Sequence, residues 1–413
     1  MRSLAHVMRC ISNRMCGWMF WLSLGFASLS QAHPTNSDST AQFLKWYWQR
    51  PLAIQQLPKP IGHESISLSP SYCSQCHVAQ FQGWTTARHS HAMDAGVLGQ
   101  LLATKAQDHA SHAECMNCHA PLAEQELSLT SAIQHTSSPW DHDPSIHEQG
   151  VVCAACHVRD GHWYGPPHRD GSGLQGNPAN YPHAGWKAET AFEDSRFCAA
   201  CHQFPAGGYA LHGKMIENTY VEWRQSTWAQ RGYTCQSCHM PDRQHLWRGI
   251  HDPVMTLKAF HIDTQFHMSP QGLIQASLQV RNTGAGHDVP TYVTPHIILE
   301  AYQTDVHGNM LVNSLKTYLI ARQVSLDVSR EIADTRLPPG GRAILSYHAS
   351  KLPNAQNLVL AIRVEPDAFY NSFYKAKLDA QLPTSERINL EKALEQTRRS
   401  PYELFRRSWQ LPL

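Results

Sequence analysis

The chain has 413 residues, which is long enough for two or three compact units. Its 34 basic and 33 acidic side chains give a formal net charge of +1, so nothing in the composition points to a nucleic-acid partner. The unusual components are 12 Cys and 27 His. Thiols in such number are expected to form disulfides, to bind metal or to be alkylated by a cofactor.

The first segment, residues 1–32, is typical of an export signal. It contains three arginines and no acidic residue, followed by an apolar run over Trp18–Leu29 and by small residues suited to cleavage at Ser30–Ala32. The apolar run is short for a membrane span, and no second one follows. We therefore expect a cleaved signal peptide and a periplasmic location. An uncleaved anchor and the extracellular face are the alternatives.

The second segment, residues 33–64, is interpreted as a leader. Its aromatic residues are Phe43, Trp46, Tyr47 and Trp48. They are expected to pack on the following domain, because large aromatic side chains gain most when they are buried. A role at a membrane surface is the alternative.

The third segment, residues 65–254, holds a repeated motif. The ten cysteines after the first segment fall without remainder into five copies of Cys-x-x-Cys-His. The cysteine pairs are Cys73 and Cys76, Cys115 and Cys118, Cys153 and Cys156, Cys198 and Cys201, and Cys235 and Cys238. This is the haem c attachment sequence, in which two thiols add to one porphyrin and the adjacent imidazole binds its iron. The iron-binding histidines are then His77, His119, His157, His202 and His239.

Two other chemistries use closely spaced cysteines, namely redox dithiols and zinc sites. A redox dithiol needs no following histidine, and a zinc site needs no such strict repetition. Five complete copies therefore predict five covalent haem c groups. The motifs span 167 residues, about 33 for each haem, so the haems must pack against one another and supply most of the domain core.

Between the motifs, apolar spacing predicts short helices within Val78–Leu102 and Thr219–Arg231. The run His162–Tyr181 is rich in Pro and Gly and is expected to be a surface loop. Long aliphatic stretches are scarce. Residues 65–254 are thus predicted to form a mostly α and irregular domain.

The fourth segment, residues 255–370, has no cysteine, and β-type runs alternate there with turn signals. The runs are Leu273–Arg281, His296–Gln303, Leu315–Val328, Arg342–His348 and Asn357–Val364. They predict a small β-sandwich. Residues 371–413 are expected to be a helical tail, with a helix over Ser385–Arg399 that has acidic residues early and basic residues late.

Several stretches resemble a known superfamily. Cys73–Met93, Phe197–Phe204 and Glu222–Pro241 resemble the multihaem cytochromes c that include the tetrahaem cytochrome of ammonia oxidisers, hydroxylamine oxidoreductase and octahaem tetrathionate reductase. The resemblance covers about residues 65–365. It implies a multihaem cytochrome c domain, followed by the β-sandwich and the C-terminal helix. It also implies haems packed in pairs with two axial histidines, so that five more ligands are needed.

The resemblance makes His89 a second iron ligand, with His91 close behind. Either His245 or His251, after the fifth motif, is expected to ligate as well. His287 lies in a Gly-rich turn that lets the backbone approach a haem closely. The alternative for each is a loop histidine that bonds a propionate. Weaker candidates are His112, His142, His147 and His183.

Two functions fit these patterns. The favoured one is a periplasmic electron carrier with five covalent haems, which relays electrons between redox partners such as a membrane quinol oxidase-type donor or another cytochrome. The alternative is a multihaem oxidoreductase that acts on a small nitrogen or sulfur compound at one open haem. Every motif keeps its histidine, so no catalytic residue is assigned. Membrane association, in particular with the outer membrane, and homo-oligomer or filament formation are further alternatives.

Overall fold

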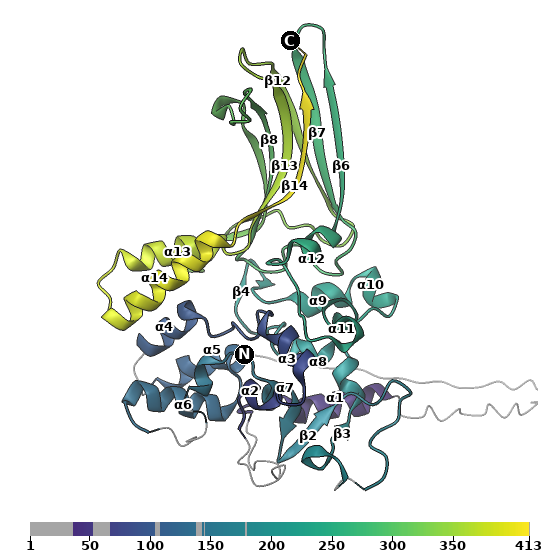
Figure 1. The fold of residues 1–413 in the computed structure, drawn as a ribbon, viewed down its shortest axis with the longest axis vertical. Coiled ribbons are helices and arrows are strands. Elements are labelled where there is room, and N and C mark those ends of the chain that lie inside the picture. The colour runs from purple at the N-terminus through teal and green to yellow at the C-terminus, as the bar shows by residue number, and fades with distance from the viewer. Residues whose placement is uncertain are drawn as a thin grey trace, which may run out of the picture.

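The computed structural model describes residues 36–52, 67–103, 108–137, 143, 145–177 and 180–412. The expected signal peptide and most of the expected leader lie outside these residues. Within the described part, no helix combines the length and the apolar character that a membrane crossing requires. Figure 1 shows a lower part made of short helices and loops, and an upper part of long strands that stands on it.

The lower part consists of short helices and a few very short strands. The helices are α1 (Asn36–Tyr47), α2 (Pro70–Cys73), α3 (Val78–Thr85), α4 (Ala95–Ala103), α5 (His109–His119), α6 (Ala123–Gln134), α7 (Cys153–His157), α8 (Arg196–Ala199), α9 (Thr219–Arg224), α10 (Thr227–Gln230) and α11 (Cys235–His239). The strands are β1 (Val158–Arg159), β2 (His162–Gly165), β3 (Lys187–Ala188), β4 (Ala210–Leu211) and β5 (Lys214–Met215). Each predicted helical stretch, 78–102 and 219–231, is split in two by a turn.

Helix α1 packs on the third motif. Tyr47 is fully buried, and its hydroxyl donates a hydrogen bond to the carbonyl oxygen of Cys156 at 2.7 Å. The buried guanidinium of Arg159 donates to the carbonyl oxygens of Tyr47 at 2.9 Å and of Ala155 at 2.6 Å. Because buried polar groups are costly when unpaired, these bonds tie the start of the described chain to the motif backbone.

The upper part contains two antiparallel sheets that face each other. Its elements are α12 (Pro253–Lys258), β6 (Phe260–Met268), β7 (Leu273–Asn282), β8 (His296–Thr304), β9 (Lys316–Ile320), β10 (Arg322–Val324), β11 (Glu331–Asp334), β12 (Arg342–Ser350), β13 (Asn357–Glu365), α13 (Ala368–Leu378), α14 (Thr384–Arg399) and β14 (Tyr402–Gln410). One sheet has the strand order β12-β7-β6 and the other β14-β13-β8-β9. A shared apolar core includes Leu278, Leu299 and Leu360, which are all fully buried.

The C-terminal residues differ from the prediction of a helical tail. The predicted helix is present as α14, but the chain then returns to the sandwich as β14, which pairs antiparallel with β13. The edge of β13 would otherwise expose unpaired backbone groups, and β14 satisfies them. Strand β6 was also not predicted, and it pairs with β7 along its whole length.

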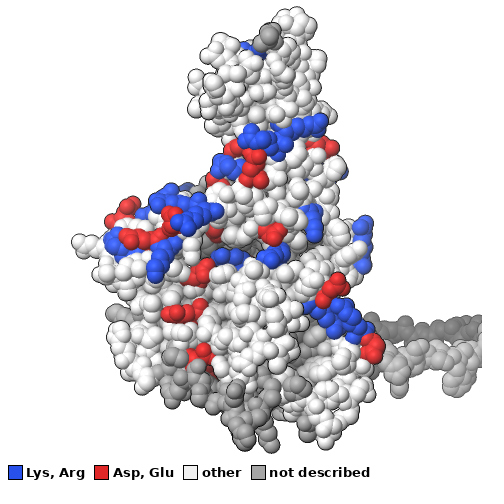
Figure 2. Space-filling model, viewed as in Figure 1, with Lys and Arg blue, Asp and Glu red and all other residues white. Residues whose placement is uncertain are grey.

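The hairpin of α13 and α14 leaves the sandwich and lies over α4 (Figure 1). Two glycines of α4 permit this approach, because a side chain at Gly96 would overlap Tyr374 of α13 and one at Gly99 would crowd Asn389 of α14. Figure 2 shows that charged side chains of both signs gather on this hairpin, whereas the upper end of the sandwich carries few on the same face.

Candidate haem sites

Each motif lies on a turn of helix that ends near its histidine. The third and fifth motifs form α7 and α11, and the second motif forms the last turn of α5. In the first motif, the backbone N–H of His77 donates to the carbonyl oxygen of Cys73 at 2.9 Å. A single helical turn presents both thiols and the imidazole toward one side, as haem attachment requires.

Four of the five motif histidines face a second histidine ring. The ring centroids are 6.4 Å apart for His77 and His183, 6.2 Å for His89 and His202, 6.1 Å for His157 and His245, and 6.3 Å for His239 and His287. These separations are too long for direct packing of the two rings. Each pair combines one motif histidine with one histidine from elsewhere in the chain.

The separations fit an iron atom between two imidazoles. A metal–nitrogen bond of about 2 Å, added to the distance of about 1.2 Å from that nitrogen to the ring centre, gives about 3.2 Å on each side of the iron and about 6.4 Å between the two centroids. All four observed separations lie within a few tenths of an ångström of this value. The residues present therefore fit haems with two axial histidines.

Backbone carbonyls fix the orientation of most of these imidazoles. In each case Nδ1–H donates to a carbonyl oxygen: His119 to Ala92 at 2.6 Å, His157 to Tyr164 at 2.8 Å, His239 to Arg248 at 2.7 Å, His183 to Gly185 at 3.0 Å, His245 to Arg243 at 3.0 Å and His287 to Asp288 at 2.8 Å. Such a bond sets the tautomer and leaves Nε2 free for a metal.

Burial keeps these imidazoles neutral, which is the form that binds iron. It lowers the pKa of His89 to about 3, and the pKa values of His157 and His239 to about 4. The pKa of His119 is also lowered, mainly by burial. No proton then has to be displaced from these rings at neutral pH before they can ligate.

The structure separates the predicted second ligands into two groups. His89, His245 and His287 each face a motif histidine, whereas His91 and His251 do not. The exposed His91 has its Nδ1 3.3 Å from Asp94 Oδ1. The Nε2 of His251 lies 3.0 Å from the carboxylate of Asp367, so a carboxylate takes the nitrogen that an iron would need.

The histidine that faces His77 is His183, which the sequence presented only as a weaker candidate for a second ligand. It lies in the loop before β3 with a positive φ of 43°, a conformation that is uncommon for a residue with a side chain. The Trp163 ring packs on it at 4.6 Å between centroids. No local sequence pattern distinguishes it from other loop histidines.

His119 is the exception among the motif histidines. Among the described residues, no second histidine ring faces it. His112 is fully buried without a hydrogen-bond partner, but it lies two turns earlier on the same helix, about 10 Å along the axis. The Nδ1 of His147 lies 2.8 Å from the Ser128 hydroxyl. The remaining weaker candidate, His142, lies outside the described residues.

The cysteines connect the five motifs to one another. Thiols from different motifs lie close enough to shift each other's pKa in three pairs: Cys73 with Cys153, Cys118 with Cys201, and Cys198 with Cys235. Cys156 is also close enough to Cys201 to interact electrostatically. The first motif thus adjoins the third, the third adjoins the fourth, and the fourth adjoins both the second and the fifth.

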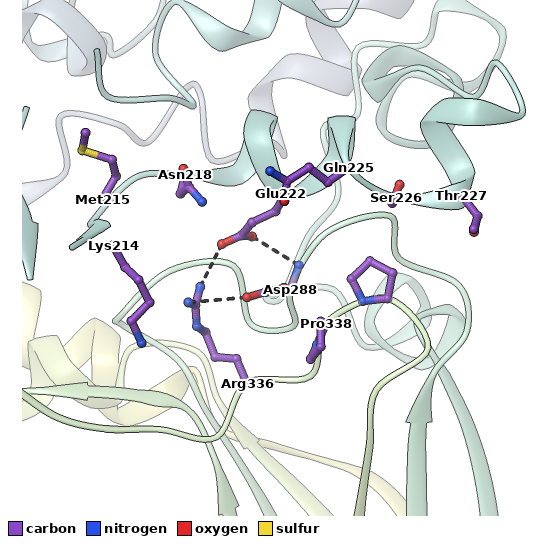
Figure 3. A pocket seen from close by; sticks show the side chains of 11 residues that line it. Lys214, Met215, Asn218, Glu222, Gln225, Ser226, Thr227, Asp288, Arg336 and Pro338 are labelled. Carbon is purple, nitrogen blue, oxygen red and sulfur yellow. Dashed lines mark hydrogen bonds and ion pairs between the residues drawn. The ribbon is translucent and has the colours of Figure 1, made fainter. Parts of the chain in front are cut away.

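A polar pocket of about 450 Å³ lies where α9 meets loops of the upper part (Figure 3). Arg336 crosses it and forms ion pairs with Glu222 at 3.1 Å and Asp288 at 3.4 Å. The carboxylate of Glu222 also accepts the backbone N–H of Asp288 at 3.2 Å. Because Asp288 follows His287, this network fixes the loop that brings His287 to the fifth motif.

The chain is similar to known haem proteins. Residues 72–158 match the family model described as cytochrome c554 and c-prime, and no curated protein matches the chain. Among solved structures, the chain is similar to a penta-heme cytochrome c552 from Thermochromatium tepidum. The TM-score is 0.57 and the identity 17%, over 83% of this chain and 98% of that chain.

Two further solved structures, a structural-genomics target and an ApaA protein from Bordetella pertussis, are similar only over short stretches. Their TM-scores are both 0.14, with identities of 12% and 13%, over 25% and 26% of this chain and 69% and 79% of theirs. Neither carries an argument about the fold. The match over residues 72–158 and the similarity to the penta-heme structure show that this chain has a multihaem cytochrome c fold.

Proposed function

We propose that this chain is a periplasmic electron-transfer protein that carries five covalently attached c-type haems and relays electrons between redox partner proteins. The observation that carries the proposal is the set of four histidine pairs, each 6.1–6.4 Å between ring centroids and each containing one motif histidine. Two axial imidazoles leave no open position on an iron, which suits electron transfer better than substrate chemistry.

The contacts between motifs support a continuous electron route. Each attached haem has its thioether edge at its two cysteines, so neighbouring cysteines of different motifs would bring two haem edges near each other. The contacts join the first, third, fourth and fifth motifs in a line, with the second motif beside the fourth. An electron accepted at one end can then leave at the other, without any bond being made or broken.

The location and the partners are part of the same proposal. The signal-like segment 1–32 supports export with cleavage, and haem c is attached on the outer side of the bacterial inner membrane. A membrane quinol oxidase-type protein or another cytochrome would supply electrons. Attachment to the outer face of the cell and assembly into oligomers are the alternatives that fractionation and light scattering would decide.

The haem count tests the proposal directly. A pyridine haemochrome assay on the mature protein should give five haems per chain, and dithionite followed by air should reduce and reoxidise all of them. Cys115→Ser with Cys118→Ser should lower the count to four, which controls for non-covalent haem. A count near zero or one in the unaltered protein would refute the proposal.

The second motif, whose His119 faces no other described histidine, favours a second function. Because no described histidine faces His119, the haem of the second motif would have a free position, and the chain could act as an oxidoreductase on a small nitrogen or sulfur compound. Low-temperature electron paramagnetic resonance of the oxidised protein should then show one high-spin haem. That signal should shift with nitrite, hydroxylamine or sulfite, and a signal that none of them shifts would exclude this second function.

A further inference from the structure

The loop that carries His287 belongs to the upper part of the molecule. Val289 and Leu337 form an antiparallel bridge there, and each backbone nitrogen lies 3.0 Å from the other's carbonyl oxygen. The fully buried Asn282 donates from Nδ2 to the carbonyl oxygens of His287 and Leu337, both at 3.0 Å. His287 nevertheless faces His239 of the lower part, whereas both histidines of the other three pairs precede α12. This pair therefore depends on how the two parts meet.

Helix α9 of the lower part carries the group that meets this loop. The indole N–H of Trp223 donates to the carbonyl oxygen of Tyr233 at 3.0 Å, and Tyr233 comes two residues before Cys235 of the fifth motif. This bond ties α9 to the motif. The neighbouring Glu222 has a side chain that is only 7% exposed. Figure 3 shows it reaching from α9 toward the backbone of Asp288.

The carboxylate of Glu222 holds the loop at two points. Its Oε2 accepts the backbone N–H of Asp288 at 3.2 Å and the hydroxyl of Thr291 at 3.1 Å. Its Oε1 lies 3.1 Å from Nη1 of Arg336, whose side chain is 4% exposed. The carbonyl oxygen of Asp288 in turn accepts Nδ1–H of His287 at 2.8 Å. Because hydrogen bonds made away from water are costly to break, these contacts transmit the position of α9 to the imidazole.

Close packing leaves the loop little freedom to move. A Cβ at Gly286 would lie 3.1 Å from both Trp223 Cδ1 and Trp228 Cβ. A Cβ at Gly284 would lie only 1.9 Å from the carbonyl oxygen of Lys258. The two glycines thus let the loop lie against α9 and α10 on one side and against the end of α12 on the other.

We propose that Glu222, oriented by Arg336, is a positioning residue for His287, and that this carboxylate keeps the second imidazole of the upper part at the fifth haem. The inference rests on the proposed haem attachment and adds the contact on which one of its ligands depends. It gives the sandwich a role in electron transfer, because the spin state and the reduction potential of a haem follow its axial ligands and the groups that orient them.

Electron paramagnetic resonance of the oxidised holoprotein tests this inference. Glu222→Ala should keep five haems and show one more high-spin haem than the wild type, because the loop no longer holds His287 in place. Cyanide should return that haem to the low-spin form. Glu222→Gln should keep most of the wild-type spectrum, since its amide oxygen can still accept the N–H of Asp288.

Glu331→Ala is the matched control. The Glu331 side chain is 8% exposed, and it pairs with the buried Arg322 at 2.9 Å and with Lys214 of β5 at 2.8 Å. It therefore also joins the two parts through a buried carboxylate, but these partners lie outside the loop that carries His287. The control should lose a comparable amount of stability and leave the number of high-spin haems unchanged.

Three outcomes would overturn the inference while leaving the electron-transfer proposal intact. They are a wild-type spectrum in Glu222→Ala, an extra high-spin haem in Glu331→Ala, and an extra high-spin signal in Glu222→Gln as strong as that in Glu222→Ala. Should Glu222→Ala fail to mature, Glu222→Asp keeps the charge but withdraws the carboxylate from the loop by one methylene. It should show part of the extra high-spin signal, and an unchanged spectrum would count equally against the inference. Fewer than five haems in the wild type would instead refute the proposed function.

Discussion

The two parts of the molecule are built on different kinds of core. In the upper part, strand β7 alternates buried and accessible side chains along its length, and both sheets share one large apolar cluster. In the lower part, α9, α10 and α11 contain no buried residue at all, and the apolar residues form several small clusters. Such small clusters provide much less apolar burial than one large core. The difference indicates that haem is the core of the lower part, whereas the upper part supplies its own.

The largest expected effect comes from removing a haem at the centre of the lower part. Cys153→Ser with Cys156→Ser should leave four haems and abolish the cooperative folding of the lower part, because the third motif adjoins the first and fourth motifs as well as α1. Far-ultraviolet circular dichroism should still show the strands of the upper part. Haem count, limited proteolysis and circular dichroism measure the three quantities.

The control for this variant changes a motif without touching its thiols. Ser74→Ala with Gln75→Ala alters only the spacer of the first motif and should keep five haems and a normal protease pattern. Unaltered protease resistance of the lower part in the Cys153 and Cys156 variant would contradict the idea that haem forms its core.

For the upper part, the sequence predicted the positions of several strands correctly but did not predict all of the strands. The runs at 273–281, 342–348 and 357–364 correspond to β7, β12 and β13 within about two residues, because alternation of apolar and polar residues is a local signal. Strand β6, Phe260–Met268, shows the same alternation, with exposed polar side chains at its odd-numbered positions, although the sequence analysis does not predict it as a strand. β14 was missed for another reason, since it follows a long helix and pairs with a strand about 45 residues earlier.

The haem ligands show the limit of sequence reasoning more clearly. The motif histidines can be identified from their spacing alone, because each lies directly after the second cysteine that would attach the same haem. The histidines that face them depend on folding: His183 lies 106 residues after His77, whereas His89 faces His202 from 113 residues before it. The sequence did not distinguish His245 from His251, because the carboxylate of Asp367, which lies 3.0 Å from His251 Nε2, comes 116 residues later in the chain.

The next largest effect on stability is expected from a substitution at the boundary between the two parts. Arg336 is only 4% exposed in its side chain and is paired with Glu222, Asp288 and Asp334. Arg336→Ala should lower the free energy of unfolding by about 3–5 kcal/mol, because it leaves the buried carboxylate of Glu222 without an ion-pair partner. Chemical denaturation measures the loss, and the exposed Arg330→Ala should change stability by less than about 0.5 kcal/mol.

The pH dependence of this variant has a definite sign. Burial raises the pKa of Glu222 even with Arg336 present, so its ionised form is disfavoured in the folded state. Without the arginine the pKa rises further, and the instability grows as the pH increases above the ordinary glutamate range. The variant should therefore be closest to the wild type near pH 4–5. A deficit that is equal at pH 5 and pH 8 would contradict this assignment.

A core substitution in the upper part should have a somewhat smaller effect, confined to that part. Leu278 is fully buried between the sheets, and Leu278→Ala should cost about 2–4 kcal/mol through lost contacts and a cavity. The haem count and the low-spin spectrum should not change, since this core is made of polypeptide alone. Ile344→Ala on β12 is the matched control, because that side chain is 43% exposed. Loss of haem in Leu278→Ala would show that the upper part is needed for attachment.

The smallest effect is expected when the same substitution, Tyr to Phe, is made in each of the two parts. Tyr47→Phe removes a hydrogen bond to the carbonyl oxygen of Cys156, and Tyr347→Phe removes one from Gln303 Nε2 at 3.0 Å in the sandwich core. Both tyrosines are buried, and each variant should lose about 1 kcal/mol because a buried polar group loses its partner. Only Tyr47→Phe should lower the midpoint of the transition followed by Soret absorbance, since Tyr47 holds the third motif. If both variants shift the Soret and the circular dichroism transitions equally, the two parts unfold as one unit. The haem core would then stabilise the sandwich as well.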